Sequence, residues 1–503
     1  MSFENNNFQV VRKTRLPKGE LNLAVQVAAG DEIAKVYAVS LNVYCDNQEI
    51  TDGVVSYSGH VDVCMIYGLE DGGIASAQAS HPFSSKFEDE QIANGEKAII
   101  ELKVVDHEIG AISGSDATIN VTVEQSGALI QNVEVRNIKS SDDSICVKED
   151  ELKIVQFVGS GISALNEKLQ TSSREKVKKV LGTEASVTIK NVEAGVNFVS
   201  VSGDVNAKVL YVDDNDRFQS ADLHDSFKEE IEIEGVNREN FVEAFARVNA
   251  SDIKVEIEDE DSSSKISLNV PFEVAAYAFE EKLITLVSDL FSTKNEVEIT
   301  SETFNMSRSI FMENIEGKAD GSLTIDQDQP RVDKIMFTFG SGAVVTNSYV
   351  ADGELTLEGI AKTTVVYLND ELGSLNAVEI EVPFVLSDKT KASSQALILT
   401  NAVLTDVDVA VKKGRELFFD GKVKVNVIIS EDEVSATISE VTEGETLAEK
   451  DYAMELIFAK EGDTLWDIAK MSKVKESMIA EQNPSLVFPL QENNDIVIFY
   501  QNV

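Results

Sequence analysis

Histidine is the side chain best suited to proton transfer near neutral pH and to metal binding through nitrogen, and this sequence contains four. They are His60, His81, His107 and His224. None lies in an HExxH or HxH arrangement, and no CxxC pair occurs, so the ligand spacing of zinc sites is absent. We therefore expect surface or strand-packing roles for these histidines, and the sequence predicts no catalytic and no metal-binding residue.

The three cysteines also lack the partners that nucleophilic chemistry needs. They are Cys45, Cys64 and Cys146. Cys64 lies beside apolar residues in a strand-like segment, and the sequence identifies no base to activate it, which favours a buried, small apolar side chain. Neither G-x-x-x-x-G-K-[ST] nor GxGxxG appears between a strand and a helix, so a nucleotide site is unsupported. The sequence thus predicts a protein that is not an enzyme and has no cofactor.

The acidic turn Asp213-Asp214-Asn215-Asp216 is the best candidate for a calcium site. Neither register fits an EF-hand loop, because Arg217 or Phe218 falls where an oxygen ligand is needed and the loop glycine is missing. Acidic runs such as residues 256–261 are typical of solvated hairpin tips. We expect no specific metal ion in either segment.

The most specific motif in the chain is Gly-Asp-Thr-Leu-Trp-Asp-Ile-Ala, at residues 462–469. Gly462 provides a permissive backbone for a tight turn, and Asp463 or Thr464 can accept hydrogen bonds from the first amides of a helix. The next residues form an apolar helical stripe, namely Leu465, Trp466, Ile468 and Ala469. A strand over 456–460, a second helix over 475–482 and a closing strand over 495–500 complete a predicted βααβ module.

A repeat with a domain-sized period precedes this module. Three segments share one frame, in which a glycine stands eight positions before a tyrosine, and copies lie roughly 150 residues apart. The pairs are Gly59 with Tyr67, Gly203 with Tyr211, and Gly359 with Tyr367. A short motif ending in phenylalanine follows each tyrosine, as Pro82-Phe83, Ser226-Phe227 and Pro383-Phe384. The chain is therefore predicted to contain three related domains.

The residues between glycine and tyrosine alternate in polarity. In the second copy Val205, Ala207 and Val209 share one face with the tyrosine, while Asp204, Asn206 and Lys208 fall on the other, which predicts a half-buried strand. The glycine is expected at a bulge or a close backbone approach. Further alternating runs with frequent turns predict antiparallel β-sandwich-like domains.

Helix-like pieces are expected to link the domains. One begins at Ser173, where a serine precedes the charged turn Arg174-Glu175-Lys176 in the manner of an N-cap. Because such ordered joints are short, they predict a fairly stiff string of domains.

Composition limits the partners and the compartment. The 503 residues include 88 acidic and 44 basic side chains, which gives a net charge of −44. Such a surface repels phosphate backbones and anionic lipids, so nucleic acid and membrane insertion are poor candidates, whereas a basic protein surface is not excluded. The few cysteines suit a reducing interior. No apolar segment has the length of a signal peptide core or a membrane span, so we expect a cytoplasmic protein.

The Gly-to-Tyr strand, the Pro-Phe motif and the stretch LITLVSDLFSTKNEVEI at residues 283–299 resemble the SPOCS domain of clostridial spore-coat proteins. In that family, tandem SPOCS copies precede one C-terminal LysM domain, and this chain has the same order. The second copy matches best, while the first lacks a clear counterpart of SDLFST. The resemblance implies SPOCS-like domains at residues 1–145, 146–292 and 293–445 and a LysM-like domain at 446–503. The expected fold is therefore mainly β, with three tandem sandwich-like domains, short linking helices and a terminal βααβ domain.

The LysM resemblance also implies a ligand-binding groove between two loops. Carried over by position, the groove would comprise Gly462, Asp463, Thr464, Leu465, Asn483, Pro484, Ser485 and Leu486. The customary Pro-Gly-Gln turn before the last strand is replaced by Gln491-Glu492-Asn493-Asn494. This departure, together with the missing export signal, favours a protein ligand over peptidoglycan.

The resemblance implies a non-enzymatic scaffold of the bacterial spore coat, acting in the mother-cell cytoplasm at the forespore surface. Its LysM-like module would dock on the basement-layer coat ATPase, while the SPOCS copies recruit other coat proteins. Two alternatives keep the fold: a self-assembling protein that forms coat layers or fibres, and a peptidoglycan-binding protein. Which partner each β-domain binds is left open by the sequence.

Overall fold

The computed structural model describes residues 3–90, 92, 97–369, 374–448 and 453–499. Antiparallel β-sheets make up most of it, which confirms the expected mainly-β class. The strands are β1 (Phe3–Asn5), β2 (Phe8–Ala28), β3 (Lys35–Thr51), β4 (Val54–Gly68), β5 (Ile74–Glu88), β6 (Lys97–Ser113), β7 (Asp116–Val135), β8 (Ile138–Ser140), β9 (Ile145–Ser172), β10 (Val177–Ala194), β11 (Phe198–Asp213), β12 (Phe218–Glu232), β13 (Phe241–Val248), β14 (Lys254–Asp259), β15 (Ser264–Ser292), β16 (Asn295–Thr324), β17 (Val332–Ala351), β18 (Glu354–Asn369), β19 (Leu375–Lys389), β20 (Leu397–Lys412), β21 (Glu416–Thr446), β22 (Met454–Ala459) and β23 (Asn494–Phe499). The helices are the 3₁₀ turn η1 (Ala250–Asp252), α1 (Leu465–Ser472) and α2 (Glu476–Gln482).

The strands form one arrangement three times, in units that we call repeat 1 (β2–β7), repeat 2 (β9–β15) and repeat 3 (β16–β21). Each repeat has a three-stranded meander, β3-β4-β5, β10-β11-β12 or β17-β18-β19. In each, the first strand pairs antiparallel with the last, as β2 with β7, β9 with β15 and β16 with β21, and this pair belongs to a second sheet. The expected boundary between residues 145 and 146 falls at the start of β9, and that between 292 and 293 falls between β15 and β16.

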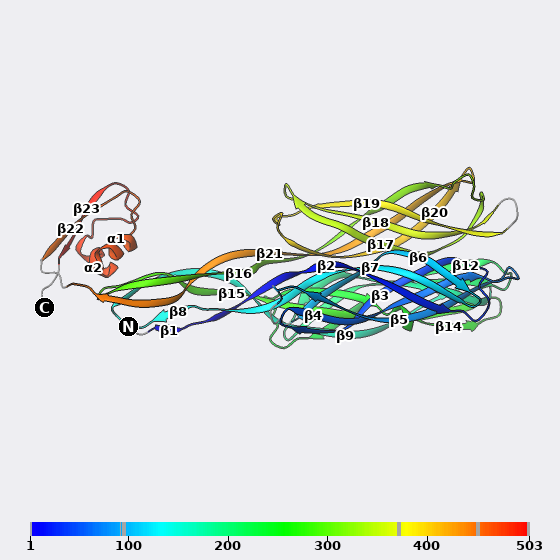
Figure 1. Ribbon diagram of the computed structural model, residues 1–503, viewed down its shortest axis with the longest axis horizontal. Helices are drawn as coiled ribbons and strands as arrows, with labels where there is room; N and C mark the ends of the chain where they lie inside the picture. Colours follow the sequence, from blue (N-terminus) through cyan, green and yellow to red (C-terminus); the bar gives the residue numbers. More distant parts are fainter. Residues whose placement is uncertain (1–2, 91, 93–96, 370–373, 449–452, 500–503) are drawn as a thin grey trace.

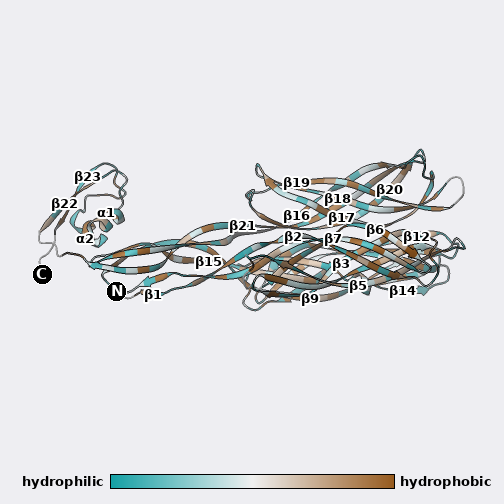
Figure 2. Ribbon diagram, in the orientation of Figure 1, coloured by the Kyte–Doolittle hydropathy of each residue, from teal (hydrophilic) through white to brown (hydrophobic). Residues whose placement is uncertain are grey.

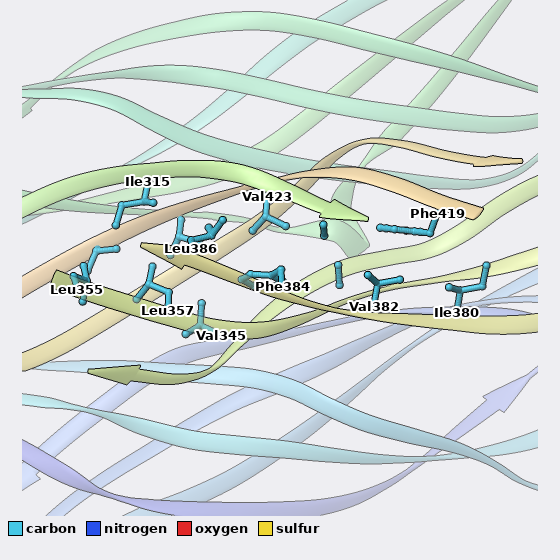
Figure 3. Close-up of a cluster of buried hydrophobic side chains, with 14 of the residues drawn as sticks. Ile315, Val345, Leu355, Leu357, Ile380, Val382, Phe384, Leu386, Phe419 and Val423 are labelled. Carbon is cyan, nitrogen blue, oxygen red and sulfur yellow. The ribbon is translucent and has the colours of Figure 1, made fainter. Parts of the chain in front are cut away.

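Each repeat encloses its own apolar core between its two sheets. Figure 3 shows the core of repeat 3, where Leu355 and Leu357 of β18 lie near Phe384 and Leu386 of β19. Brown and teal segments alternate along many strands of the body in Figure 2, as expected when side chains point to opposite faces of a sheet.

The recurring glycine is explained by a close approach between neighbouring strands. Gly203 pairs with Phe227 on one side and with Ile189 on the other, and the preceding strand has a bulge between Ile189 and Asn191. A Cβ atom at Gly203 would lie 2.0 Å from the carbonyl oxygen of Thr188. Repeats 1 and 3 have the same geometry at Gly59 and Gly359. Of the two alternatives expected at the glycine, the close approach is confirmed, and the bulge lies in the neighbouring strand rather than at the glycine.

Near the tyrosine the strands of the repeat are covered on both faces, whereas the expected half-buried alternation holds around the glycine. Leu210 falls on the face expected to be polar, yet it is buried, as are Ile66 and Val366 at the matching positions. These side chains form one apolar cluster that also contains Leu181 and Phe339 and thus draws on all three repeats. The outer face of each meander therefore packs against the other repeats.

The repeats lie side by side, and the expected string of domains is wrong. Figure 1 shows repeat 3 alongside the bundle of repeats 1 and 2 rather than beyond it. A second shared cluster joins Val11 and Ile130 of repeat 1, Val155 and Phe279 of repeat 2, and Leu399 of repeat 3. The repeats pack in this way because the connections between them are short, nine residues between β7 and β9 and two between β15 and β16, and the outer faces of their sheets carry apolar side chains.

A buried ion pair crosses the same interface. The Nζ atom of Lys13 in repeat 1 lies 2.6 Å from Oε1 of Glu243 in repeat 2, and both side chains are at most 1% exposed. The backbone N–H of Lys13 donates to Oγ of Ser307 in repeat 3. Burial lowers the pKa of Lys13 and raises that of Glu243, and the opposite charge of each partner counteracts the shift.

Several strands extend well beyond the body. β15, β16 and β21 contain 29, 30 and 31 residues, enough for up to about 100 Å of extended chain. The ends of these strands form an arm together with β1 and β8, which lie beside the N-terminus. The helices α1 and α2 lie at the same end of the molecule as this arm (Figure 1). The C-terminal helices and strands are therefore held at one end of an elongated molecule.

The expected linking helices are wrong. Within the described residues the helices are η1, α1 and α2, and none of them joins two repeats. The hydroxyl of Ser173, expected to cap a helix, instead accepts the N–H of Ser264 at the start of β15. The residues that follow in β10 include many β-branched side chains, which favour a strand. No helix in the described part of the chain has the length and apolarity needed to span a membrane.

Candidate binding site in the C-terminal module

The C-terminal module consists of β22, α1, α2 and β23, in the order strand, helix, helix, strand. β22 and β23 pair antiparallel, with Ile457 opposite Ile496. Both isoleucines are buried with Ile468 of α1 and Ile479 of α2, so the helices cover one face of the two-stranded sheet. This small core positions the loops that the sequence marks as a binding site.

The first loop has the local chemistry that the sequence predicts. Gly462 adopts a φ of 93°, in the region that favours glycine. Thr464 is the N-cap of α1, and its hydroxyl accepts the N–H of Asp467 at 3.2 Å. The Asp467 carboxylate accepts the Thr464 N–H at 2.9 Å and closes a capping box, and hydrogen bonds from Thr464 lower the pKa of Asp467. Of the two predicted capping residues, Thr464 performs this role, while Asp463 accepts the N–H of Lys460.

The second loop begins at Asn483, which ends α2. Its side-chain amide donates to the carbonyl of Val497 at 2.8 Å and accepts the Val497 N–H at 3.1 Å, so this one residue fastens α2 to β23. Pro484 and Ser485 follow at the surface, and the Leu486 N–H donates to the carbonyl of Asn483. Asn483 therefore has a structural role, which leaves Pro484 and Ser485 as the accessible part of the loop.

The two loops pack against the same core, but each forms its hydrogen bonds with another part of the module. Leu465 and Leu486 both pack against the core of the module. The first loop bonds instead to the segment before β23, through Gly462 N–H to Leu490 O and Glu461 N–H to Asn493 Oδ1. Asn493 lies where the usual Pro-Gly-Gln turn is replaced, so the substituted turn has its own means of fixing the Gly-Asp-Thr loop.

The same module has an exposed apolar surface that lies outside its predicted binding groove. Met454, Leu456 and Phe458 alternate along β22 on the face opposite the helices, and they are 54%, 45% and 75% exposed. Val497 lies across from Leu456 on β23. We call these four residues the outer face of the module. The sequence carries a signal for it, because five of the six residues of β22, all except Glu455, are apolar, which predicts a strand that is apolar on both faces.

A contact that the sequence did not predict joins the module to repeat 2. The indole N–H of Trp466 donates to Oδ2 of Asp289 at 2.8 Å, and Lys470 Nζ lies 2.6 and 2.8 Å from the two carboxylate oxygens. The Trp466 and Phe291 ring centroids are 5.2 Å apart. Asp289 and Phe291 belong to the SDLFST stretch, whose sequence indicates a resemblance to SPOCS domains and no contact with the module.

The acidic turn considered as a calcium site is engaged in structural contacts. Oδ1 of Asp213 accepts the N–H groups of Asn215 and Arg217, each at 2.9 Å, so the acidic turn uses its buried carboxylate on its own backbone. Burial raises the pKa of Cys45 to about 11 and that of Cys64 to about 12. Among the described residues, no three His, Cys, Asp or Glu side chains are grouped so that they could hold a metal ion.

A cavity of about 780 Å³ lies between the three repeats, lined by β3 and β6, β10 and β13, and β17 and β20. These are edge strands, and side chains of neighbouring repeats cap their free backbone groups. Glu184 of β10 accepts the N–H groups of Gly340 and Ser341 at 2.6 and 2.9 Å, and Glu101 of β6 accepts the Thr400 N–H at 2.7 Å. Burial raises the pKa of Glu184, against the effect of nearby Lys208. The cavity is thus bordered by the contacts that join the repeats.

The family model described as the SipL SPOCS domain matches residues 176–258, from β10 to β14 of repeat 2. The matched segment contains Gly203, Tyr211 and Phe227, the frame that recurs in all three repeats. No curated protein and no solved structure matches the chain. The match supports a SPOCS domain in this segment and indicates a sporulation-related protein.

Proposed function

We propose that this chain is a non-enzymatic scaffold in spore-coat assembly. In this proposal the C-terminal module docks on the basement-layer coat ATPase at the forespore surface, in the mother-cell cytoplasm, and the three repeats recruit further coat proteins. The observation that carries the docking role is the outer face of the module, where Met454, Leu456 and Phe458 are exposed together at one end of an elongated chain. Rows of exposed apolar side chains on a small domain are typical of protein interaction surfaces.

The SPOCS match in repeat 2 supports the sporulation context. The acidic composition supports a partner with a basic rim, because net charge of opposite sign speeds and orients association. An adaptor of this kind raises the local concentration of several coat proteins at one surface, so each single contact can be weak. The ligand would lie on the outer face or in the loop groove of Gly462–Leu465 and Asn483–Leu486, and these two positions are experimentally separable.

Deletion of residues 454–503 should remove binding to the basement-layer ATPase. We expect the purified full chain to retain the ATPase in a pull-down and the truncated chain to lose it, while both recover the same amount of other coat proteins from sporulating cells. Circular dichroism of the truncated chain is the control for intact repeats. Equal retention of the ATPase by both chains would contradict the docking role.

Two charge insertions distinguish the outer face from the groove. Phe458→Glu places a carboxylate at the most exposed position of the outer face, whereas Ser485→Glu places one in the exposed second loop. We expect Phe458→Glu to weaken ATPase binding by about tenfold or more, as loss of an apolar anchor does, and Ser485→Glu to change it little. The opposite order of effects would place the ligand in the groove. Co-sedimentation with purified peptidoglycan tests the glycan alternative, and electron microscopy tests self-assembly into fibres.

A further inference from the structure

The end of β15 is shaped to present two side chains to the C-terminal module. β9 and β15 pair out to this end, where Phe291 lies opposite Cys146. The register shifts between Val287 and Asp289, so one extra residue in β15 forms a bulge immediately before Asp289. A bulge changes the direction of the side chains that follow it. Asp289 and Phe291 then fall on the same side of the strand, two positions apart.

The module meets this strand end with one stripe of α1. Trp466 and Lys470 are spaced by four residues and lie on one side of α1, and Lys473 is the capping residue that follows the helix. Trp466 packs on Phe291, and both Trp466 and Lys470 bond to Asp289. The Nζ atom of Lys473 lies 2.9 Å from Oε2 of Glu296, at the start of the next strand, β16. The tryptophan and the two lysines of the module are thus matched by a phenylalanine and two carboxylates at the strand ends.

Burial and charge show that this contact is specific. Phe291 has no exposed surface and belongs to the core of the module, although it comes from repeat 2. In the described part of the chain, the apolar side chains from outside the module that join this core are Phe291 and Cys146. Partial burial opposes ionisation of Asp289, but hydrogen bonds from Lys470 and Trp466 outweigh it and hold the pKa of that carboxyl below its usual range.

We propose that the end of β15 is a docking surface for the module of the same chain, in which Asp289 is the specificity-determining residue that binds Trp466 and Lys470 together. The end of repeat 2 then has a task that repeat 1 does not share, which explains why SDLFST lacks a clear counterpart in repeat 1. Docking occupies α1 and leaves the outer face free, because that face lies on the opposite side of the sheet from the helices. Only the use of that free face for coat docking rests on the proposed function.

Trp466 is the single tryptophan of the chain, so its fluorescence reports on the docking directly. Asp289→Lys replaces an attractive contact with a repulsive one. The matched control is Asp150→Lys, which makes the same charge change at an exposed position of the same arm. Charge-assisted hydrogen bonds of this kind change an equilibrium by about tenfold or more when lost. We expect acrylamide quenching of Trp466 to increase clearly in Asp289→Lys and to stay at the wild-type level in Asp150→Lys.

A charge swap and a second measurement complete the experiment. Asp289→Lys combined with Lys470→Asp should restore part of the protection of Trp466, because the ion pair is rebuilt with reversed signs. Amide exchange at Ile479 of α2, in the core of the module, is expected to stay slow and so to show that the released module remains folded. Wild-type quenching in Asp289→Lys, or no recovery in the double variant, would overturn the proposal. Because the full chain is measured alone, the result is independent of any coat partner.

Discussion

Replacing Lys13 with methionine should lower the free energy of unfolding by about 3–5 kcal/mol, because the change leaves the Glu243 carboxylate buried without its counter-charge. Oε2 of Glu243 has no hydrogen-bond partner among the described residues, so Lys13 supplies the main compensation for burying this charge. The pair lies where repeats 1 and 2 meet, and the Lys13 backbone is bonded to Ser307 of repeat 3. Chemical denaturation at neutral pH measures the loss.

The pH dependence of this variant gives an independent check. Burial raises the pKa of Glu243, so in the native state it binds a proton at pH values where the unfolded chain does not. The stability of Lys13→Met should therefore recover as pH falls from 7 towards the ordinary glutamate pKa of about 4.3. The free energy of unfolding of a Lys13→Met, Glu243→Met double variant should lie within about 1 kcal/mol of the wild-type value, because an apolar pair of similar volume often replaces a buried ion pair without loss of stability. A double variant as unstable as Lys13→Met would contradict this explanation.

Gly203→Ala should destabilise the chain by about 1–3 kcal/mol or more, which is typical of overpacking. The added Cβ atom would lie 2.0 Å from the carbonyl oxygen of Thr188 and 2.8 Å from the ring of Phe227, so the two strands would have to separate. Thermal unfolding followed by circular dichroism measures the effect. Gly59→Ala in repeat 1 is expected to behave in the same way, because its Cβ would meet the carbonyl oxygen of Tyr44 at 1.9 Å.

Gly342→Ala is the matched control for this prediction. Gly342 also lies in a strand of a repeat, but a Cβ atom there would meet nothing within 4 Å. We expect its effect on stability to stay within about 0.5 kcal/mol. If Gly203→Ala were as mild as Gly342→Ala, the close approach would not be the reason for the recurring glycine.

The frame of the repeat could be predicted from sequence because its physical cause is local. Gly203 and Phe227 are close in the chain and meet across one pair of neighbouring strands, so their spacing is visible in the sequence. The same holds for the cap of α1, where Thr464 and Asp467 lie three residues apart. Ser173 shows the limit of such local reasoning, since its hydroxyl is used by Ser264, which is 91 positions away in the chain.

The packing of the repeats against one another depends on contacts that alternation alone does not specify. Val209, Leu210 and Tyr211 are consecutive and all buried, which is the pattern of a strand covered on both faces. The alternation of residues 204–209 predicts a polar face. Leu210 interrupts that alternation, and its burial shows that the face is covered. Lys208 lies on that face, and its Nζ donates to Thr338 Oγ1 of repeat 3 at 2.9 Å. Polar side chains on the outer face of the meander β10-β11-β12 thus take part in the contacts between repeats.

The two loops of the candidate site could be predicted from the sequence, whereas the contact of the module with repeat 2 could not. The Gly-Asp-Thr loop and Asn483 could be placed from their residue types, because turns and caps have strong local preferences. The contact of Trp466 with Asp289 links residues 177 positions apart and depends on how far the arm of repeat 2 extends. The docking of the module on repeat 2 follows from that arrangement in space.

Localisation of a tagged chain in sporulating cells tests the scaffold assignment most directly. The full chain and a chain lacking residues 454–503 would be expressed at equal levels and imaged as the forespore is engulfed. The proposed function predicts that the full chain gathers at the forespore surface and that the truncated chain stays dispersed in the mother-cell cytoplasm. A truncated chain that gathers at the forespore like the full one would contradict docking through the C-terminal module.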